Sequence, residues 1–163
     1  MYKKEKKYKI FFYTVLIDNY DVISDPDINI SHKYNFYCIT NNLNNKSNVF
    51  KIIKTKKNFS SGFLTSRYYK ILPHCISEFK NFDYSVYFDA NIELKEPILE
   101  ILNDFIKSDC DLALIKHPQR KNIYEEAELN IKLGNVSKFQ VDQHNKYFKK
   151  HNYISKNDLT ENN

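Results

Sequence analysis

Asp89 and Asn91 form the pattern in this chain whose spacing most directly suggests chemistry. They follow the apolar run 84–88 in the stretch YSVYFDANIEL. Residues two apart in an extended segment point to the same side, so a carboxylate oxygen and an amide oxygen could share one hard cation. Such a cation would in turn hold a diphosphate. The alternative is a plain turn, because Asp and Asn often end strands.

A second pattern is basic and lies on a predicted helix. Arg67, Lys70 and His74 stand at positions i, i+3 and i+7, which share one helical face if the helix continues through Pro73. The Arg fork matches phosphate oxygens, and Lys supplies a mobile point charge. The same positions would equally suit a solvated rim whose opposite side is buried.

The stretch KHPQRKNIYEEAE (116–128) brings together His117, Arg120, Glu125 and Glu126. Histidine acts as a metal ligand or as an acid–base group at neutral pH, so His117 and the two glutamates are candidate catalytic residues. Acids at the start of a helix also stabilise its dipole, which accounts for at least one glutamate without any chemistry. That explanation does not cover a His-Pro and an Arg directly after a predicted strand.

Alternating apolar runs and amphipathic segments predict the elements that must position these residues. Strands are expected at 8–17, 34–40, 49–53, 84–88 and 110–115, and helices at 63–72, 96–107, 122–133 and 136–151. This alternation indicates an α/β domain with a covered, mostly parallel central sheet. Ligands of such sheets bind outside the carboxyl ends of the strands. The polar residues expected at that edge are Thr14 to Asp21 (Tyr20 included), Thr40, Asn41, Asp89, Asn91, Lys116 and His117.

Composition narrows the function classes. The chain has 163 residues and two glycines, so it fits one domain and holds neither a G-x-G-x-x-G motif nor a Walker loop. The net charge of +5 includes lysine clusters at 3–9 and 46–57, for which solvated strand flanks are the simpler interpretation than a nucleic-acid surface. Three cysteines without metal spacing predict free buried thiols and a cytoplasmic protein. The apolar run 10–17 is too short to span a bilayer.

Together these motifs resemble a glycosyltransferase-like family long catalogued as domain of unknown function 616, which includes plant mucilage-related and bacterial polysaccharide-locus proteins. The resemblance runs through nearly the whole chain and rests on ordered pieces: YTVLIDNYD, YCITNN, SRYYKILPH, YSVYFDANIEL, IKHPQRKNIYEEAE and QHNKYFKKHNY. That family is similar to GT-A glycosyltransferases. The resemblance therefore implies a GT-A-like, Rossmann-type sandwich.

The resemblance also implies a function and its ligands. Asp89 and Asn91 would hold Mn²⁺ or Mg²⁺ against the diphosphate of a nucleotide-sugar donor, and residues 14–21 and Thr40 would line the nucleotide. Arg67 and Lys70 would face the phosphates or the sugar. His117, Arg120, Glu125 and Glu126 would surround the transferred sugar or the acceptor, expected to be a cell-surface glycan or a lipid-linked precursor. Peripheral association with the inner membrane face is compatible with such a substrate, and no nucleic-acid partner is expected.

Two departures from the family pattern keep alternatives open. Asn41 stands where relatives usually show an acid, and relatives usually continue beyond NDLTENN with a further strand. The expectation is thus a single domain over 1–163 without that C-terminal segment, in which a third metal ligand could lie. The alternative function is a degenerate, non-catalytic domain that binds a partner or an anionic glycan.

Overall fold

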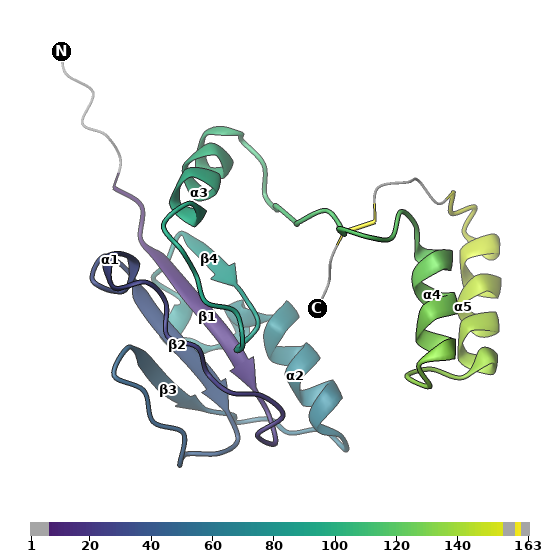
Figure 1. Cartoon of the computed structure of the whole chain (residues 1–163), viewed down its shortest axis with the longest axis horizontal. Helices are drawn as coiled ribbons and strands as arrows, with labels where there is room; N and C mark the ends of the chain where they lie inside the picture. The colour runs from purple at the N-terminus through teal and green to yellow at the C-terminus, as the bar shows by residue number, and fades with distance from the viewer. Residues whose placement is uncertain (1–6, 155–158, 161–163) are drawn as a thin grey trace. The chain divides into compact units, whose positions relative to one another are not determined.

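The chain divides into two compact units, Met1–Lys107 (unit 1) and Ser108–Asn163 (unit 2). The computed structural model describes residues 7–154 and 159–160 of them. Unit 1 contains the sheet, and unit 2 contains two helices (Figure 1). The expectation of one domain over 1–163 stays a prediction.

Unit 1 is built on four parallel strands: β1 (Ile10–Leu16), β2 (Asn35–Thr40), β3 (Phe50–Lys54) and β4 (Tyr84–Tyr87). Their order in the sheet is β3-β2-β1-β4, so β1 is interior and β4 forms one edge (Figure 1). Strands β1, β2 and β4 lie within predicted apolar runs, β3 extends one residue beyond its predicted run of 49–53, and every pairing is parallel. The predicted α/β class with a parallel sheet is confirmed.

Helices cover both faces of this sheet, because side chains alternate along each strand. Phe12 points to one face, where it joins a core with Leu102 of α3 (Ile98–Lys107). Phe11 points to the other face and joins Tyr69 of α2 (Gly62–Ile71). The first face also holds α1 (Ile28–Ser31), and the second holds the 3₁₀ turns η1 (Pro73–Cys75) and η2 (Ser77–Phe79).

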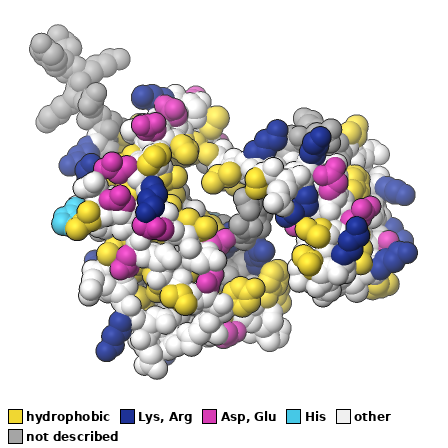
Figure 2. Space-filling view, in the orientation of Figure 1, with side chains coloured by type: hydrophobic (Ala, Val, Ile, Leu, Met, Phe, Trp, Pro, Cys, Tyr) yellow, Lys and Arg dark blue, Asp and Glu magenta, His cyan; other side chains and the backbone are white. Residues whose placement is uncertain are grey.

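Unit 2 is a helical hairpin of α4 (Ile123–Lys132) and α5 (Lys138–Lys150), both predicted from the sequence. Gly134, with φ of +74°, ends the first helix as expected, and Ser137 opens the second with a capping box. Neither helix has a buried residue among those described. Hydrophobic side chains remain at the surface (Figure 2), including Leu133, Phe139 and Tyr147.

The predicted strand at 110–115 is wrong. These residues form no regular element, and all of them are exposed, including Leu112, Leu114 and Ile115. An apolar run becomes a strand only when a neighbouring strand takes its backbone hydrogen bonds. In the described part of the chain, only Lys116 just beyond this run makes a bridge, with Thr160.

The cysteines are free, as expected, but only Cys38 is buried. Cys75 and Cys110 are exposed, because they lie in η1 and in the irregular segment 108–115 and not in the core. Among the described residues, no helix combines the length and apolar character that crossing a membrane requires.

Candidate functional site

Asp89 lies at the carboxyl edge of the sheet, two residues after β4 ends. Phe88 still pairs with the sheet, donating its N–H to the Tyr13 carbonyl at 3.2 Å, and its side chain is buried in the core. Strand alternation therefore sends Asp89 to the same face as Tyr87, the face that α2 covers. Its side chain is 28% exposed, so the carboxylate is partly open to solvent.

Tyr87 and Lys70 hold the Asp89 carboxylate. The Tyr87 hydroxyl donates a hydrogen bond of 2.5 Å to Oδ1, and the Lys70 ammonium lies 3.9 Å from the same oxygen. Lys70 is only 10% exposed, and its Nζ lies 4.4 Å from the centre of the Tyr87 ring. Burial, and then the hydrogen bond to Asp89, raise the pKa of the Tyr87 phenol well above its usual range. The phenol is therefore a stable hydrogen-bond donor at neutral pH.

Two further contacts fix this cluster to the sheet. The Tyr13 hydroxyl donates to the Lys70 carbonyl at 2.6 Å, which ties the last turn of α2 to β1. Tyr13 also lies beside Tyr87, with ring centres 5.3 Å apart. The charge of Arg67 acts on the Tyr87 phenol, lowering its pKa against the larger effect of burial. The structure thus places Lys70 beside Asp89, and Arg67 acts electrostatically on the neighbouring Tyr87. The predicted binding of phosphate or sugar by Arg67 and Lys70 stays a prediction.

Asn91 and His74 are arranged differently from the prediction. The Ile92 N–H donates to the Asp89 carbonyl at 3.0 Å, so residues 89–92 form a turn and not the extended segment that was assumed. Asn91 is exposed in that turn. Helix α2 ends at Ile71, because Pro73 starts a separate 3₁₀ turn, and His74 leaves the helical face of Lys70. A shared role of Asp89 and Asn91 in metal binding stays a prediction.

Thr14 and Thr40 require a correction. Both are fully buried inside the sheet, so neither hydroxyl is open to a ligand. The Thr40 hydroxyl instead accepts the Asn42 N–H at 3.0 Å and an Asn45 amide N–H at 3.2 Å, which shapes the loop after β2. Thr14 lies in mid-strand on the face of the Phe12 core.

The loop after β1 runs beside the loop after β4. The Ser24 N–H donates to the Ala90 carbonyl at 2.7 Å, and the Asp27 N–H donates to the Leu94 carbonyl at 2.9 Å. Tyr20 is 93% exposed at the tip of this loop, and Asp21 is partly exposed. Both are open to a ligand, and their nucleotide-binding role stays a prediction.

Sequence reasoning missed the pairing of Asp18 with Asn41. Asn41 Nδ2 donates to Asp18 Oδ1 at 2.6 Å, and its Oδ1 accepts the Asp18 N–H at 2.9 Å. Asp18 adopts the left-handed backbone conformation, with φ of 57°. This pair joins the carboxyl ends of β1 and β2. An Asp after one strand and an Asn after the neighbouring parallel strand was the available signal.

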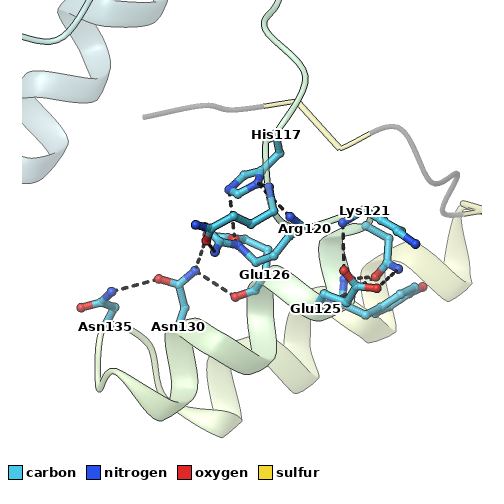
Figure 3. A network of polar contacts seen from close by, with 10 residues as sticks. His117, Arg120, Lys121, Glu125, Glu126, Asn130 and Asn135 are labelled. Carbon is cyan, nitrogen blue, oxygen red and sulfur yellow. Dashed lines mark hydrogen bonds and ion pairs between the residues drawn. The ribbon is translucent and has the colours of Figure 1, made fainter. Parts of the chain in front are cut away.

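The residues predicted in unit 2 form their own polar network (Figure 3). His117 Nδ1 accepts the backbone N–H groups of Gln119 and Arg120 at 3.1 and 3.0 Å. A neutral imidazole in this position carries its proton on Nε2, which faces Glu126 Oε2 at 3.9 Å. The His117 side chain is only 7% exposed.

Both glutamates already have partners. Glu126 Oε2 accepts a hydrogen bond from Arg120 Nε, and its Oε1 accepts one from Asn130 at 2.8 Å. Glu125 accepts the Lys121 backbone N–H at 2.8 Å and an Asn122 amide N–H at 3.1 Å, both next to the start of α4. This arrangement fits the alternative in which acids stabilise a helix start. A catalytic role for His117, Glu125 or Glu126 stays a prediction.

A parallel α/β sheet with an acid and two basic side chains at its carboxyl edge defines a class, the α/β domains that bind ligands at the ends of their strands. Comparison with known proteins identifies the family within this class. Residues 39–160 match the family model of the TOD1/MUCI70 glycosyltransferase-like domain. The chain belongs to that family. No curated protein and no solved structure gives a significant match.

The match includes all of the predicted site residues except Thr14, Tyr20 and Asp21. The predicted resemblance to a glycosyltransferase-like family is confirmed at that level. The GT-A relationship and the older catalogue name stay predictions.

Proposed function

We propose that this chain is a metal-dependent glycosyltransferase domain that moves a sugar from a nucleotide-sugar donor to a cell-surface glycan or its precursor. Family membership supports transferase chemistry in general. The observation that carries the proposal is the cluster at the carboxyl edge of the sheet, where Asp89 lies beside Lys70 and the charge of Arg67 acts on the adjoining Tyr87. Charge neutralisation of a departing diphosphate is the main electrostatic demand of glycosyl transfer.

A cation would be held by oxygen donors that this edge offers. In the described residues, no group of three or more His, Cys, Asp or Glu side chains is placed to hold a metal ion. Carboxylate and amide oxygens nevertheless suit Mg²⁺ or Mn²⁺, which commonly bind through one or two carboxylates plus substrate phosphates. Asp89 and Asn91 fit that smaller ligand set. A bound divalent cation would stabilise the negative charge of the diphosphate leaving group.

The chain's own residues prepare this site. Tyr87 and Lys70 both contact Oδ1 of Asp89, so Oδ2 is the carboxylate oxygen to face a cation. Lys70 and Arg67 place positive charge next to the same edge, where they would bind phosphate oxygens. A general base for the acceptor must present an open lone pair, and Glu125 and Glu126 each already accept one hydrogen bond at each carboxylate oxygen, which leaves further lone pairs on both. His117, Glu125 and Glu126 therefore stay the candidate catalytic residues.

Calorimetric titration with UDP and with GDP, each with and without Mn²⁺, tests the proposal. Wild-type protein should bind one nucleotide in a manganese-dependent manner, and Asp89→Asn should lose this dependence because it removes the charge without changing the shape. Asp104→Asn is the matched control, since Asp104 is exposed on α3. Circular dichroism would confirm that both variants fold. Equal metal-dependent binding by wild type and Asp89→Asn would contradict the proposal.

One observation supports a second candidate, a non-catalytic domain that binds a partner or glycan. The polar groups of unit 2 satisfy one another, as expected for a structural network. If neither UDP nor GDP binds under any metal condition, this second function is the better one.

A further inference from the structure

A groove of about 310 Å³ in unit 1 has no part in the proposed function. It lies between the end of β3, helix α2 and the turns η1 and η2, and all of its lining residues belong to unit 1. The lysine run of the sequence supplies one side of it. Four lysines line the groove: Lys54, Lys56, Lys57 and Lys80. The volume lies at the small end of the range for small-molecule sites, roughly 300–1,000 Å³.

The loop that carries two of these lysines is held rigidly. The buried Tyr69 hydroxyl accepts the backbone N–H of Lys56 at 2.9 Å and that of Lys57 at 2.7 Å. Farther along the loop, the Phe59 N–H donates to the Thr65 hydroxyl of α2 at 2.9 Å. A loop fixed in this way presents its charges with little ordering cost on binding.

The charges of the groove are strongly one-sided. Among the described residues that line it, four lysines stand against a single acid, Glu78. Lys56 contacts that acid at 3.8 Å, in an exposed pair that attracts only weakly. The remaining lysines keep the groove positive, and a surplus of ammonium groups along one groove favours a bound anion.

The aromatic residues beside the groove favour a small charged ligand over single-stranded nucleic acid. Lys57 Nζ lies 4.6 Å from the centre of the Tyr68 ring and 4.8 Å from that of Phe59, so one face of each ring already contacts a cation and is closed to base stacking. Tyr69 is buried. Recognition here must rest on charge and on hydrogen bonds.

We propose that this groove is a second binding site, which takes the phosphate or carboxylate group of a small anionic saccharide. Its lysines supply the charge, and membership of a glycosyltransferase-like family favours a sugar as the rest of the ligand. The site is distinct from the Asp89 cluster. Lys54 ends β3 and Tyr87 ends β4, the two outer strands of the sheet. Three strand spacings, about 15 Å, separate them.

Amide chemical-shift titration of the whole chain tests this site without requiring any transferase activity. The probes are glucose 6-phosphate, glucuronate, glucose and inorganic phosphate. We expect the two anionic sugars to shift the amides of Lys56, Lys57 and Ser77, glucose to have no effect, and inorganic phosphate to bind more weakly than glucose 6-phosphate. The stronger of the two anionic sugars identifies the preferred group.

A pair of charge-reversed variants separates this groove from general charge attraction. Lys54→Glu with Lys80→Glu should weaken binding by about tenfold or more, because each change replaces attraction with repulsion and spares the packing of Lys57. Lys33→Glu with Lys107→Glu changes the net charge equally at exposed positions outside the groove, and should leave binding unchanged. Equal losses in both pairs, or glucose binding as well as glucose 6-phosphate does, would overturn the proposal. Inorganic phosphate binding as tightly as glucose 6-phosphate would overturn its saccharide part.

Discussion

At the residue scale, the geometry of Asp89 depends on a tyrosine that the sequence did not mark as functional. Tyr87 belongs to an apolar strand, and its type suggests only core packing. Alternation along the strand, however, places it on the same face as Asp89, where its hydroxyl reaches the carboxylate at 2.5 Å. The functional signal was therefore an aromatic hydroxyl two residues before an acid at a strand end.

Tyr87→Phe removes that hydroxyl and should destabilise unit 1. The loss of a hydrogen bond to a charged group costs about 1–2 kcal/mol in a partly exposed pair. Urea unfolding at pH 8 of wild type, Tyr87→Phe, Asp89→Asn and the double variant would isolate the interaction between the two side chains. Strict additivity of the two single changes would show that this hydrogen bond contributes nothing to stability.

The pH dependence of the same variant has a definite sign. Burial and Asp89 raise the pKa of Tyr87 in the folded chain above its unfolded value of 10.0. The protonated Tyr87 phenol therefore makes its full contribution to the free energy of unfolding below pH 10. This contribution falls as pH rises above 10, since the unfolded phenol loses its proton first. The free energy of unfolding, measured by urea titration at a series of pH values, should therefore decline less steeply above pH 10 in Tyr87→Phe than in wild type.

At the scale of elements, the sequence predicted those helices and strands whose formation depends on local apolar periodicity and capping. The strands β1 to β4 and the four long helices follow from apolar periodicity and from caps such as Gly134. The error at 110–115 has a different origin, because pairing with a neighbouring strand is not encoded in the run itself. Helix α1 was missed since it has only four residues and begins at a cap, Asp27, inside a polar loop.

The first residue of α2 is Gly62, and the surrounding atoms leave no room for a larger side chain there. A Cβ at this position would lie 2.0 Å from Asp18 Oδ2 and 3.2 Å from Ile17 Cγ2. Moving the Asp18 side chain aside would disturb the hydrogen bond that its Oδ1 accepts from Asn41 Nδ2. Gly62→Ala should therefore destabilise unit 1 by about 1–3 kcal/mol, the usual cost of overpacking, as measured by thermal or urea unfolding.

A second substitution tests whether the Asp18 carboxylate causes the loss of stability in Gly62→Ala. In an Asp18→Ala background, Gly62→Ala should cost clearly less, because the obstructing carboxylate is gone. Gly134→Ala is the contrast: nothing lies within 4 Å of its Cβ position, and its cost comes from the φ of +74°. That cost should not respond to Asp18→Ala. The same penalty for Gly62→Ala in both backgrounds would rule out the steric explanation.

At the scale of the whole molecule, the two units differ in how their side chains are enclosed. Unit 1 has aromatic and aliphatic cores on both faces of its sheet. The described helices of unit 2 have no buried residue, and a polar network around His117 joins the segment before α4 to that helix. Sequence patterns indicated both helices of unit 2, but they could not show how completely the apolar residues would be covered.

Cys38 offers a direct measure of the stability of unit 1. It is fully buried in the core of β2, and this burial raises the pKa of its thiol to about 12. The thiolate is the reactive form, so a thiol reagent at pH 8 should label Cys38 only when unit 1 opens. In a Cys75→Ser, Cys110→Ser variant, the labelling rate should be slow in buffer and should rise exponentially with urea, with the slope of global unfolding.

The exposed cysteines provide the internal comparison. Cys75 and Cys110 should react at once in the folded wild-type chain. Two equivalents of the thiol reagent should therefore be consumed rapidly, and a third slowly as Cys38 reacts. The Tyr87→Phe and Gly62→Ala variants should each accelerate Cys38 labelling by the factor that their loss of stability predicts, which is about tenfold per 1.4 kcal/mol where opening is fast and reversible. Rapid labelling of Cys38 without denaturant would mean that the core around β2 opens locally, independently of the rest of the sheet.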